Sequence, residues 1–375
     1  MLESLSEVYL AVGGEGSGWR EKGFKRAAAV LRGLGTQISG VQQLRDLKKT
    51  EPGRVRGLGE SALKLLEEFY SAGTMGRLEG LASQSKVKAL RAFQKIWGVG
   101  PKKAEELEAA GFRTIEGVRE SGREMLNIQQ LVGLDRYEDL LERMPRAEAA
   151  EIEATVAAAA KKLCPEVHCQ ACGSYRRGKD ACGDVDVLIR PPEGHEDCSI
   201  MLPLLESLRS SGFITDDLSL PKEHRTGHSQ SYMGVCKLPG EGRRYRRLDV
   251  KLYPTSMFGF ALLYFTGSGH FNCSMRYYAK MQGLSLSDKG LKAVNRVAGE
   301  KVHSFPSYSC PREEDVFTAL GLEWRCPRDR SGYDVHPTAG DMKSAMGSGT
   351  LAGAPGEDDD HIEAWEESAE EDMLD

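Results

Sequence analysis

The sequence has no apolar run that approaches the roughly 20 residues of a membrane-spanning helix, and its first residues lack the basic and apolar blocks of a secretion signal. It also lacks a regular cysteine framework, because its nine cysteines are an odd number at irregular spacing. Cys169 and Cys172 have the spacing of zinc ligands, but no second pair follows, so packed thiols are predicted. These absences argue against a membrane protein and a disulfide-bonded secreted scaffold, and they favour a reducing compartment.

The chain also lacks the basic excess of a typical nucleic-acid-binding protein, because 56 acidic side chains outnumber 50 basic ones. The imbalance arises at the end of the chain, where residues 357–375 hold eleven acids and no lysine or arginine. Residues 1–356 therefore carry 50 basic and 45 acidic side chains and are mildly basic. Residues 331–375, rich in glycine, serine and alanine before they turn acidic, predict a disordered tail. A solvated extension is the favoured interpretation of this tail, and a segment that binds the basic body or a partner is the alternative.

One short stretch combines a phosphate-type turn with two carboxylates. Gly173 and Ser174 open a glycine-bounded turn whose backbone N–H groups suit phosphate oxygens. Asp184 and Asp186 follow in a predicted strand over residues 184–189, where alternate side chains face the same side. Two adjacent carboxylates repel unless a cation neutralises them, and oxygen ligands suit magnesium or manganese.

A third carboxylate, Asp249, lies in another predicted strand over residues 245–252. Three carboxylates on neighbouring strands could hold two divalent ions, which would lower the pKa of an attacking hydroxyl and balance the charge of a triphosphate. The sequence therefore predicts a two-ion Mg²⁺ or Mn²⁺ centre. Its metal-binding and catalytic residues would be Asp184, Asp186 and Asp249.

These motifs resemble those of the family X DNA polymerases. The likeness covers residues 171–188 and recurs in order at residues 96–98, 141–146, 262–268 and 281–286. It extends from about residue 5 to about residue 328, so that it covers nearly all of the chain except the tail.

The resemblance implies an α+β fold in five parts. These are a helical lyase-like DNA-binding domain at residues 1–85, a helical fingers subdomain at 86–142, a mixed α/β nucleotidyltransferase palm at 143–253, an α+β thumb at 254–330 that closes over the nucleotide, and the disordered acidic tail at 331–375. Hydrophobic periodicity adds strands near residues 167–172, 184–189, 232–237 and 245–252, and helices near 200–211 and 271–281.

Two glycine turns between predicted helices point to nucleic acid. The first contains Gly57 and Gly59, and the second contains Gly98 and Gly100 followed by Lys102. Such a turn exposes N–H groups at a helix start, where they can donate to a DNA phosphate beside a bound Na⁺ or K⁺. One copy is more often a plain connection, but two copies favour DNA binding. They resemble the paired helix-hairpin-helix elements of the family, which would grip one strand on either side of a gap.

The resemblance also assigns residues around the metal centre. Contacts to the incoming nucleotide are implied for Arg143, Gly173, Ser174, Arg177, Gly183, Tyr264, Phe265, Gly267 and Asn272. Among these, Tyr264 and Phe265 would pack against the sugar and leave no room for a 2′-hydroxyl, with core packing as the alternative. DNA contacts are implied for Arg247, at the primer end, and for Arg276, on the template side. Asp249 would also help to deprotonate the primer 3′-hydroxyl.

The first domain departs from the family where a lyase lysine is expected. Members that excise a 5′-deoxyribose phosphate use a lysine amine that forms a Schiff base with the sugar aldehyde. Counting from Gly59 places Leu65 at that position, and Lys64, the lyase candidate, lies one residue earlier and about 100° around the helix. Glu60 and Ser61 stand where basic side chains would hold the 5′-phosphate. An absent or weak lyase is therefore predicted.

The resemblance implies a monomeric nuclear polymerase that fills short gaps in double-stranded DNA, or acts at broken ends, with deoxynucleoside triphosphates. Base-excision repair and non-homologous end joining are the implied pathways, with repair factors as partners and no membrane attachment. One alternative is a template-independent terminal transferase, which the pair Tyr264-Phe265 and the short loop at residues 239–243 disfavour. The other alternative is a DNA-end-binding module with an idle catalytic centre.

Overall fold

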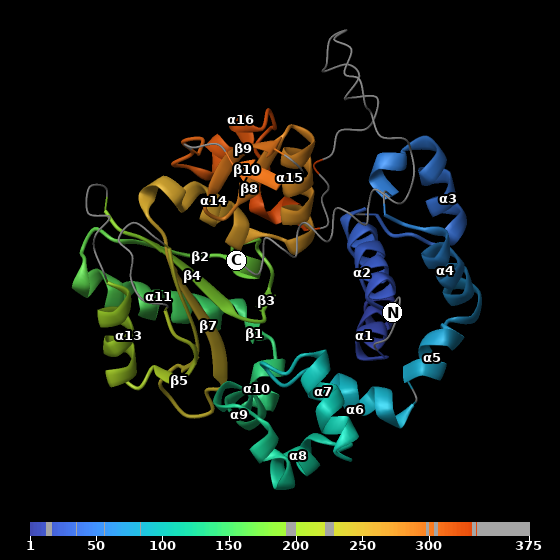
Figure 1. Ribbon diagram of the computed structural model, residues 1–375, viewed down its shortest axis with the longest axis horizontal. Coiled ribbons are helices and arrows are strands. Elements are labelled where there is room, and N and C mark those ends of the chain that lie inside the picture. The colour runs from blue at the N-terminus through green and yellow to red at the C-terminus, as the bar shows by residue number, and fades with distance from the viewer. Residues whose placement is uncertain are drawn as a thin grey trace.

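The computed structural model describes residues 1–12, 17–34, 36–55, 57–82, 84–192, 200–221, 229–297, 300–303, 307–331 and 335. Figure 1 shows the N-terminal helices along one side of the molecule and a sheet on the other, with α6–α10 at one end and α14–α16 at the opposite end. Within the described ranges, no helix is both long and apolar enough to cross a bilayer. The predicted disordered tail, apart from Ser331 and Val335, lies outside these ranges.

The first part of the chain is helical throughout. Its elements are α1 (Leu2–Val12), α2 (Ser17–Gly33), α3 (Val41–Thr50), η1 (Pro52–Val55), α4 (Glu60–Ala72) and α5 (Gly76–Ala82). Each longer helix buries one apolar face, as α4 does with Leu63 and Leu66, while Lys64 on the same helix is exposed. These faces form one core around Leu5, Leu44 and Leu63.

A second helical group follows. It comprises α6 (Ser85–Phe93), α7 (Pro101–Ala109), α8 (Ile115–Ser121), η2 (Arg123–Met125), α9 (Ile128–Asp135) and α10 (Tyr137–Leu141). Its core gathers around Phe93 and Leu107, and α1 adds Val8 and Ala11 to it. The first helix therefore packs against both groups, which ties the two together.

The central part holds a mixed five-stranded sheet. Its elements are β1 (Met144–Pro145), α11 (Arg146–Leu163), β2 (His168–Ala171), α12 (Gly173–Arg176), β3 (Ala181–Cys182), β4 (Val185–Arg190), α13 (Met201–Ser210), β5 (Ile214–Ser219), β6 (Gln230–Lys237) and β7 (Tyr245–Leu252). The strand order is β2-β4-β7-β6-β5, with β4 and β7 parallel and the other pairs antiparallel. The four strands predicted from periodicity all belong to this sheet.

The edge strand β5 was not predicted, because its sequence Ile-Thr-Asp-Asp-Leu-Ser carries two acids in the middle. It is a strand through its pairing with β6, interrupted by register shifts. The loop between β6 and β7 is short, as predicted, since β6 ends at Lys237 and β7 begins at Tyr245.

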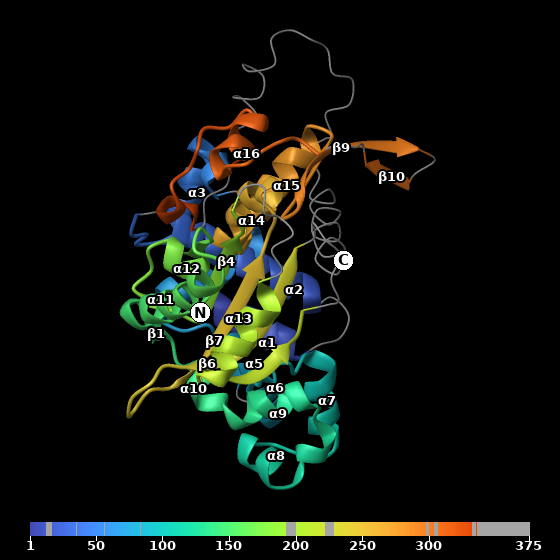
Figure 2. The same ribbon diagram turned by 90° about the vertical axis from the view of Figure 1, so that its left-hand side faces the viewer.

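The last part packs against the sheet through α14, which contacts the inner strand β4. It comprises α14 (Thr255–Thr266), α15 (Gly269–Met281), β8 (Leu284–Ser287), β9 (Gly290–Val297), β10 (Glu300–His303), α16 (Glu313–Ala319) and η3 (Pro327–Arg330). Figure 2 shows β9 and β10 projecting from the body of the molecule. Helix α14 is apolar on nearly every face because it is buried between the sheet and α15–α16. The predicted α+β fold, with helices first and a mixed α/β part after them, is confirmed.

Candidate active site

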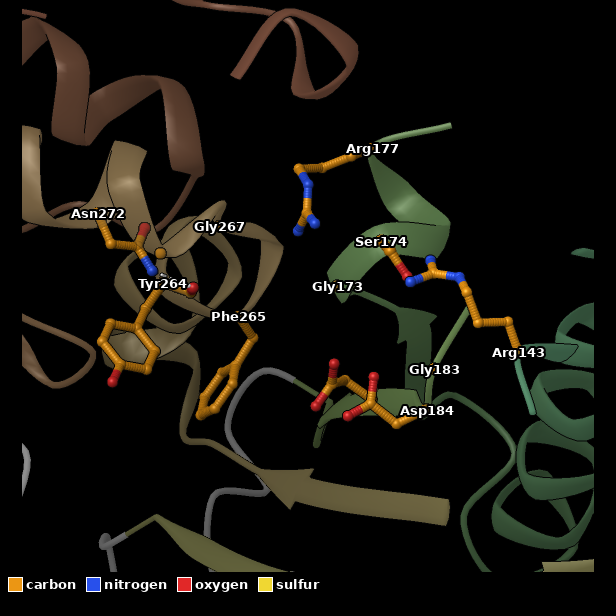
Figure 3. A pocket seen from close by; sticks show the side chains of 12 residues that line it. Arg143, Gly173, Ser174, Arg177, Gly183, Asp184, Tyr264, Phe265, Gly267 and Asn272 are labelled. Atoms are coloured by element: carbon orange, nitrogen blue, oxygen red, sulfur yellow. Dashed lines mark hydrogen bonds between the residues drawn. The ribbon is translucent and has the colours of Figure 1, made fainter. Parts of the chain in front are cut away.

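A cleft of about 390 Å³ opens between the sheet and α14–α15. Figure 3 shows side chains entering it from α12, from the segment before β4 and from α14–α15. All nine residues predicted to contact a nucleotide line this cleft, together with Asp184, Asp186 and Gly269. The sequence motifs that carry these residues are up to 129 positions apart, from Arg143 to Asn272, and the fold brings them together.

The turn at the start of α12 lies directly against the carboxylates. Gly173 has a φ of +56°, and a Cβ placed there would be 2.5 Å from Oδ2 of Asp186. The position therefore requires glycine for two reasons, its left-handed backbone and the closeness of the carboxylate. The backbone N–H of Cys172 donates to the carbonyl of Asp186 at 2.8 Å, which fixes the turn against β4.

Asp186 and Asp249 lie side by side on the parallel strands β4 and β7, where they are paired in register. Burial raises the pKa of both carboxyl groups, and at Asp186 the charges of Asp184 and Asp249 raise it further, from 3.8 to about 7. Oδ1 of Asp249 is buried and has no hydrogen-bond partner in the described part of the chain. Buried carboxylates that repel one another and leave an oxygen unsatisfied are suited to a divalent cation.

The third carboxylate has a different partner. Arg247 donates from Nη2 to Oδ2 of Asp184 at 2.6 Å and lies 3.9 Å from Oδ2 of Asp249. Among the described residues, no three histidine, cysteine or acidic side chains are grouped as a metal site. The donor atoms fit a hard cation, but Asp184 faces the guanidinium, so ion binding would require it to exchange this partner.

The raised pKa of Asp186 predicts a pH effect on the metal-free protein. The folded state keeps a proton that the unfolded chain releases between 3.8 and about 7, so the free energy of unfolding falls as pH rises through that window. Asp186→Asn cannot ionise and should escape this loss. In urea denaturation with EDTA, the free energy of unfolding of Asp186→Asn relative to that of the wild type should grow by about 2–3 kcal/mol from pH 5 to pH 8. Excess Mg²⁺ should stabilise the wild type alone, and an advantage that does not change with pH would refute the assignment.

Two arginines from different elements reach the cleft (Figure 3). Arg177 donates from Nη1 to the carbonyl of Thr266 at 2.6 Å and so joins α12 to the end of α14. Arg143 is exposed and donates from Nη2 to the carbonyl of Ala181 at 2.5 Å. Both guanidinium groups therefore point into a space bounded by carboxylates and glycines, which suits a polyanion bridged by cations.

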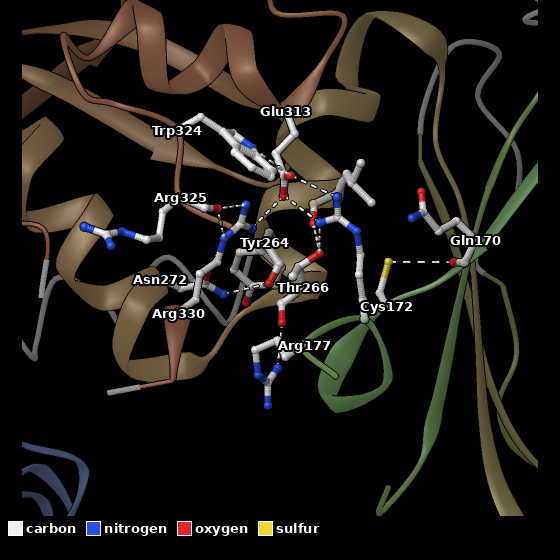
Figure 4. A network of polar contacts seen from close by, with 12 residues as sticks. Gln170, Cys172, Arg177, Tyr264, Thr266, Asn272, Glu313, Trp324, Arg325 and Arg330 are labelled. Carbon is white, nitrogen blue, oxygen red and sulfur yellow. Dashed lines mark hydrogen bonds and ion pairs between the residues drawn. The ribbon is translucent and has the colours of Figure 1, made fainter. Parts of the chain in front are cut away.

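A buried ion network behind the cleft was not anticipated from the sequence. Glu313 accepts from Nη1 and Nη2 of Arg176 at 2.8 and 2.9 Å and from Nη1 of Arg330 at 2.6 Å (Figure 4). Arg176 also donates to the hydroxyl of Thr266 at 2.7 Å. The network joins α12 in the sheet part to α14, α16 and η3. Glu313 is 137 positions from Arg176 and 17 positions from Arg330 in the sequence. No local sequence pattern could therefore have revealed the network.

The aromatic pair lies at the carboxyl end of α14. The rings of Tyr264 and Phe265 are 5.2 Å apart in a T-shaped arrangement, and Phe265 packs similarly on Tyr253 at 5.7 Å. The side chain of Asn272 donates to the carbonyl of Tyr264 at 2.7 Å, which holds α15 against this corner. The guanidinium of Arg276 lies 5.6 Å from the Tyr264 ring. Tyr264, Phe265 and Asn272 thus form one rim of the cleft, and Arg276 lies beside this rim against the Tyr264 ring.

The two glycine turns have the same backbone pattern. Gly57 and Gly98 have φ values of +90° and +81°, while Gly59 and Gly100 are the N-cap residues of α4 and α7 with extended backbone. Each turn therefore presents the first N–H groups of a helix, and Lys102 beside the second turn is exposed. The shared geometry agrees with two equivalent phosphate sites, which remain a prediction.

The surroundings of Lys64 do not favour a lyase. Lys64 is exposed, whereas its neighbour Leu65 is half-buried against the first core. Glu60, at the start of the same helix, pairs with Arg45 and Lys48 at 3.4 and 3.6 Å. An acid therefore occupies the helix start where a phosphate would bind, and it engages the nearby cations. Arg56, another basic residue of this region, lies outside the described residues.

Comparison with known families matches three consecutive parts of the chain. The model of the DNA polymerase beta palm matches residues 143–255, and that of the DNA polymerase beta thumb matches residues 261–331. The fingers domain of DNA polymerase lambda matches residues 91–141. The cleft described above lies within the first two of these parts.

Two similar proteins extend the likeness to the first helices. The chain is 44% identical to the DNA polymerase lambda of Rattus norvegicus over 331 residues, which cover 88% of this chain and 55% of that protein. It is 30% identical to the DNA polymerase lambda of Arabidopsis thaliana over 332 residues, which cover 87% of this chain and 60% of that protein. The chain thus spans little more than half the length of these curated relatives.

Proposed function

Because this chain belongs to the family X DNA polymerases and resembles DNA polymerase lambda, we propose that it is a template-directed DNA polymerase that fills short gaps during repair. The observation that carries the proposal is the cleft itself, in which nine predicted nucleotide-binding residues surround Asp184 and Asp186. The substrates would be gapped or broken double-stranded DNA and deoxynucleoside triphosphates.

The proposed chemistry follows from the side chains around the cleft. Asp184, Asp186 and Asp249 would hold two divalent ions, Mg²⁺ or Mn²⁺. When bound, such ions supply Lewis acidity to the primer 3′-hydroxyl and balance the charge of the triphosphate. Asp249, whose Oδ1 has no partner among the described residues, would also help to deprotonate the primer 3′-hydroxyl.

The remaining residues would bind and orient the substrate. Arg143, Arg177 and the N–H groups of the Gly173 turn would bind the triphosphate, since guanidinium forks and backbone amides suit phosphate oxygens. Tyr264 and Phe265 would face the sugar. Arg247 would exchange Asp184 for the primer end when the ions bind, and Arg276 would contact the template side.

A short β6–β7 connection supports templated synthesis over terminal transfer. Residues 238–244 link the two strands, and a loop of that length cannot take the place of a template strand. The test is extension of a labelled primer on a single-nucleotide gap with a 5′-phosphate and on a single strand, with Mg²⁺ and then Mn²⁺. Insertion of the complementary deoxynucleotide on the gap alone is expected. Indiscriminate addition to the single strand would indicate a terminal transferase, and no addition to either would indicate an idle binding module.

We propose that the lyase is absent or weak. Borohydride trapping on a 5′-deoxyribose-phosphate substrate should give an adduct roughly a hundredfold slower than a competent lyase, because Leu65 stands at the position expected for the lysine and Lys64 is displaced around α4. Lys64→Ala should leave the yield unchanged, whereas Leu65→Lys should increase it. Trapping at the rate of a competent lyase, lost in Lys64→Ala, would overturn the prediction.

Several finer features belong to the same proposal. The chain would divide at residues 85, 142, 253 and 330 as predicted, with Gly57, Gly59, Gly98, Gly100 and Lys102 contacting DNA, and Na⁺ or K⁺ at the two glycine turns. It would act as a monomer in the nucleus, in base-excision repair or non-homologous end joining, with repair factors as partners.

A further inference from the structure

Arg246 is a buried arginine that the proposed chemistry does not use. Only 4% of its side chain is exposed, and it precedes Arg247 on β7. Because successive side chains of a strand point to opposite faces, Arg247 reaches Asp184 while Arg246 points away from the carboxylates. It points toward α10 and the start of α11.

Each of the three guanidinium nitrogens of Arg246 donates to an acceptor. Nε and Nη2 donate to the two carboxylate oxygens of Glu148, both at 2.9 Å. Nη1 donates to the carbonyls of Glu142 and Asp139 at 2.8 and 3.4 Å. The two carbonyls belong to the end of α10, where such groups lack partners within the helix, and Glu148 lies in the first turn of α11. One side chain therefore joins two helices across the segment between them.

That segment contains Arg143. Its backbone lies between the Glu142 carbonyl, which Arg246 holds, and Met144, which pairs with Cys182 in the short β1–β3 ladder. The Arg143 side chain itself is exposed, and within the described part of the chain it donates only to the carbonyl of Ala181. An exposed arginine with one protein bond depends on its backbone for its direction into the cleft.

We infer that Arg246 is a positioning residue that fixes the α10–α11 junction and so aims Arg143 at the triphosphate of the incoming nucleotide. The inference rests on the proposed function, because it takes a nucleotide as the ligand of the cleft. Arg246 does not line the cleft, so in this inference its effect passes through Arg143 alone.

The test is a double-mutant cycle of Arg246→Lys and Arg143→Ala, with nucleotide affinity as the readout. Lysine keeps the charge of Arg246 but cannot hold Glu148 with two nitrogens and both carbonyls at once. Equilibrium titration of the complementary nucleotide against protein bound to a gapped DNA with a dideoxy primer end gives the Kd without chemistry. Arg246→Lys should weaken binding about tenfold, and the double variant should bind no more weakly than Arg143→Ala.

Arg244→Lys is the matched control. Arg244 pairs with Asp139 and Glu142 at the same junction, both at 3.0 Å, but it is 45% exposed, so its replacement should leave the Kd unchanged. If Arg246→Lys does not fold, Glu148→Gln loosens the same junction from α11 and should show the same dependence on Arg143.

Effects of the two substitutions that multiply in the double variant, or an Arg246→Lys protein with unchanged affinity, would overturn the inference and leave the proposed function intact. A wild type that binds no nucleotide would overturn both. Transfer to a primer with a 3′-hydroxyl, measured separately, tests the proposed function alone.

Discussion

Asp249→Asn is expected to reduce nucleotide insertion on a gapped substrate at least about a thousandfold, or about 4 kcal/mol in the activation barrier, while binding of the gapped DNA persists. The substitution keeps the shape of a side chain that is almost fully buried beside Asp186, but it removes the negative charge. It also replaces one carboxylate oxygen with an amide NH₂ group, whose nitrogen cannot coordinate a metal ion. Single-turnover insertion and DNA affinity, measured on the same preparation, check both halves of the expectation.

The matched control is Glu241→Gln, which removes one negative charge at an exposed position of the β6–β7 connection. It should insert nucleotides at the wild-type rate. Insertion by Asp249→Asn within a few fold of wild type would remove Asp249 from the catalytic residues. If Asp249→Asn loses both DNA binding and nucleotide insertion, the substitution instead disrupts the sheet.

Glu313→Ala is expected to destabilise the protein by about 3–5 kcal/mol, because it leaves the buried Arg330 and the half-buried Arg176 without their shared counter-ion. Glu313 and Arg330 are 1% and 0% exposed, and Arg330 also stacks against the rings of Phe271 and Phe317. Burial alone would raise the pKa of Glu313, but the hydrogen bonds from Arg330 and Arg176 outweigh it and hold the pKa below its ordinary value. The carboxylate is therefore charged and paired in the folded protein.

The stability change is measured by urea denaturation, with hydrogen exchange of α14 and α16 to locate it. Glu314→Ala, the adjacent acid, is the control and should change stability by less than about 0.5 kcal/mol. Glu313→Ala should also weaken nucleotide binding, since its partner Arg176 precedes Arg177 in the turn that lines the cleft. An equal stability of Glu313→Ala and Glu314→Ala would show that the network contributes nothing.

Local sequence was enough to predict the strands that carry the carboxylates. The alternation of Val185, Val187 and Ile189 with Asp186 made one face apolar and the other acidic, and the structure buries the apolar face in the main core. Gly173 and Ser174 could be recognised as a turn because a backbone with positive φ selects glycine wherever the chain adopts it. The strand β5 was missed, because its two acids hide a pairing that only the neighbouring strand β6 imposes.

The sequence by itself determined the candidate residues for the proposed chemistry: a phosphate-type turn, three acids in or next to two strands, and an aromatic pair at the end of an apolar helix. Turn, strand and helix patterns depend on residues within a few positions of one another, so they can be recognised in the sequence. Only the tertiary structure decided how these parts are held. Arg176 meets Glu313, Arg246 meets Glu142 and Glu148, and Arg247 meets Asp184 across 63 to 137 positions. A surface arginine and a buried, paired one look alike in a sequence, because what distinguishes them is loss of water, and that loss occurs only when distant elements pack together.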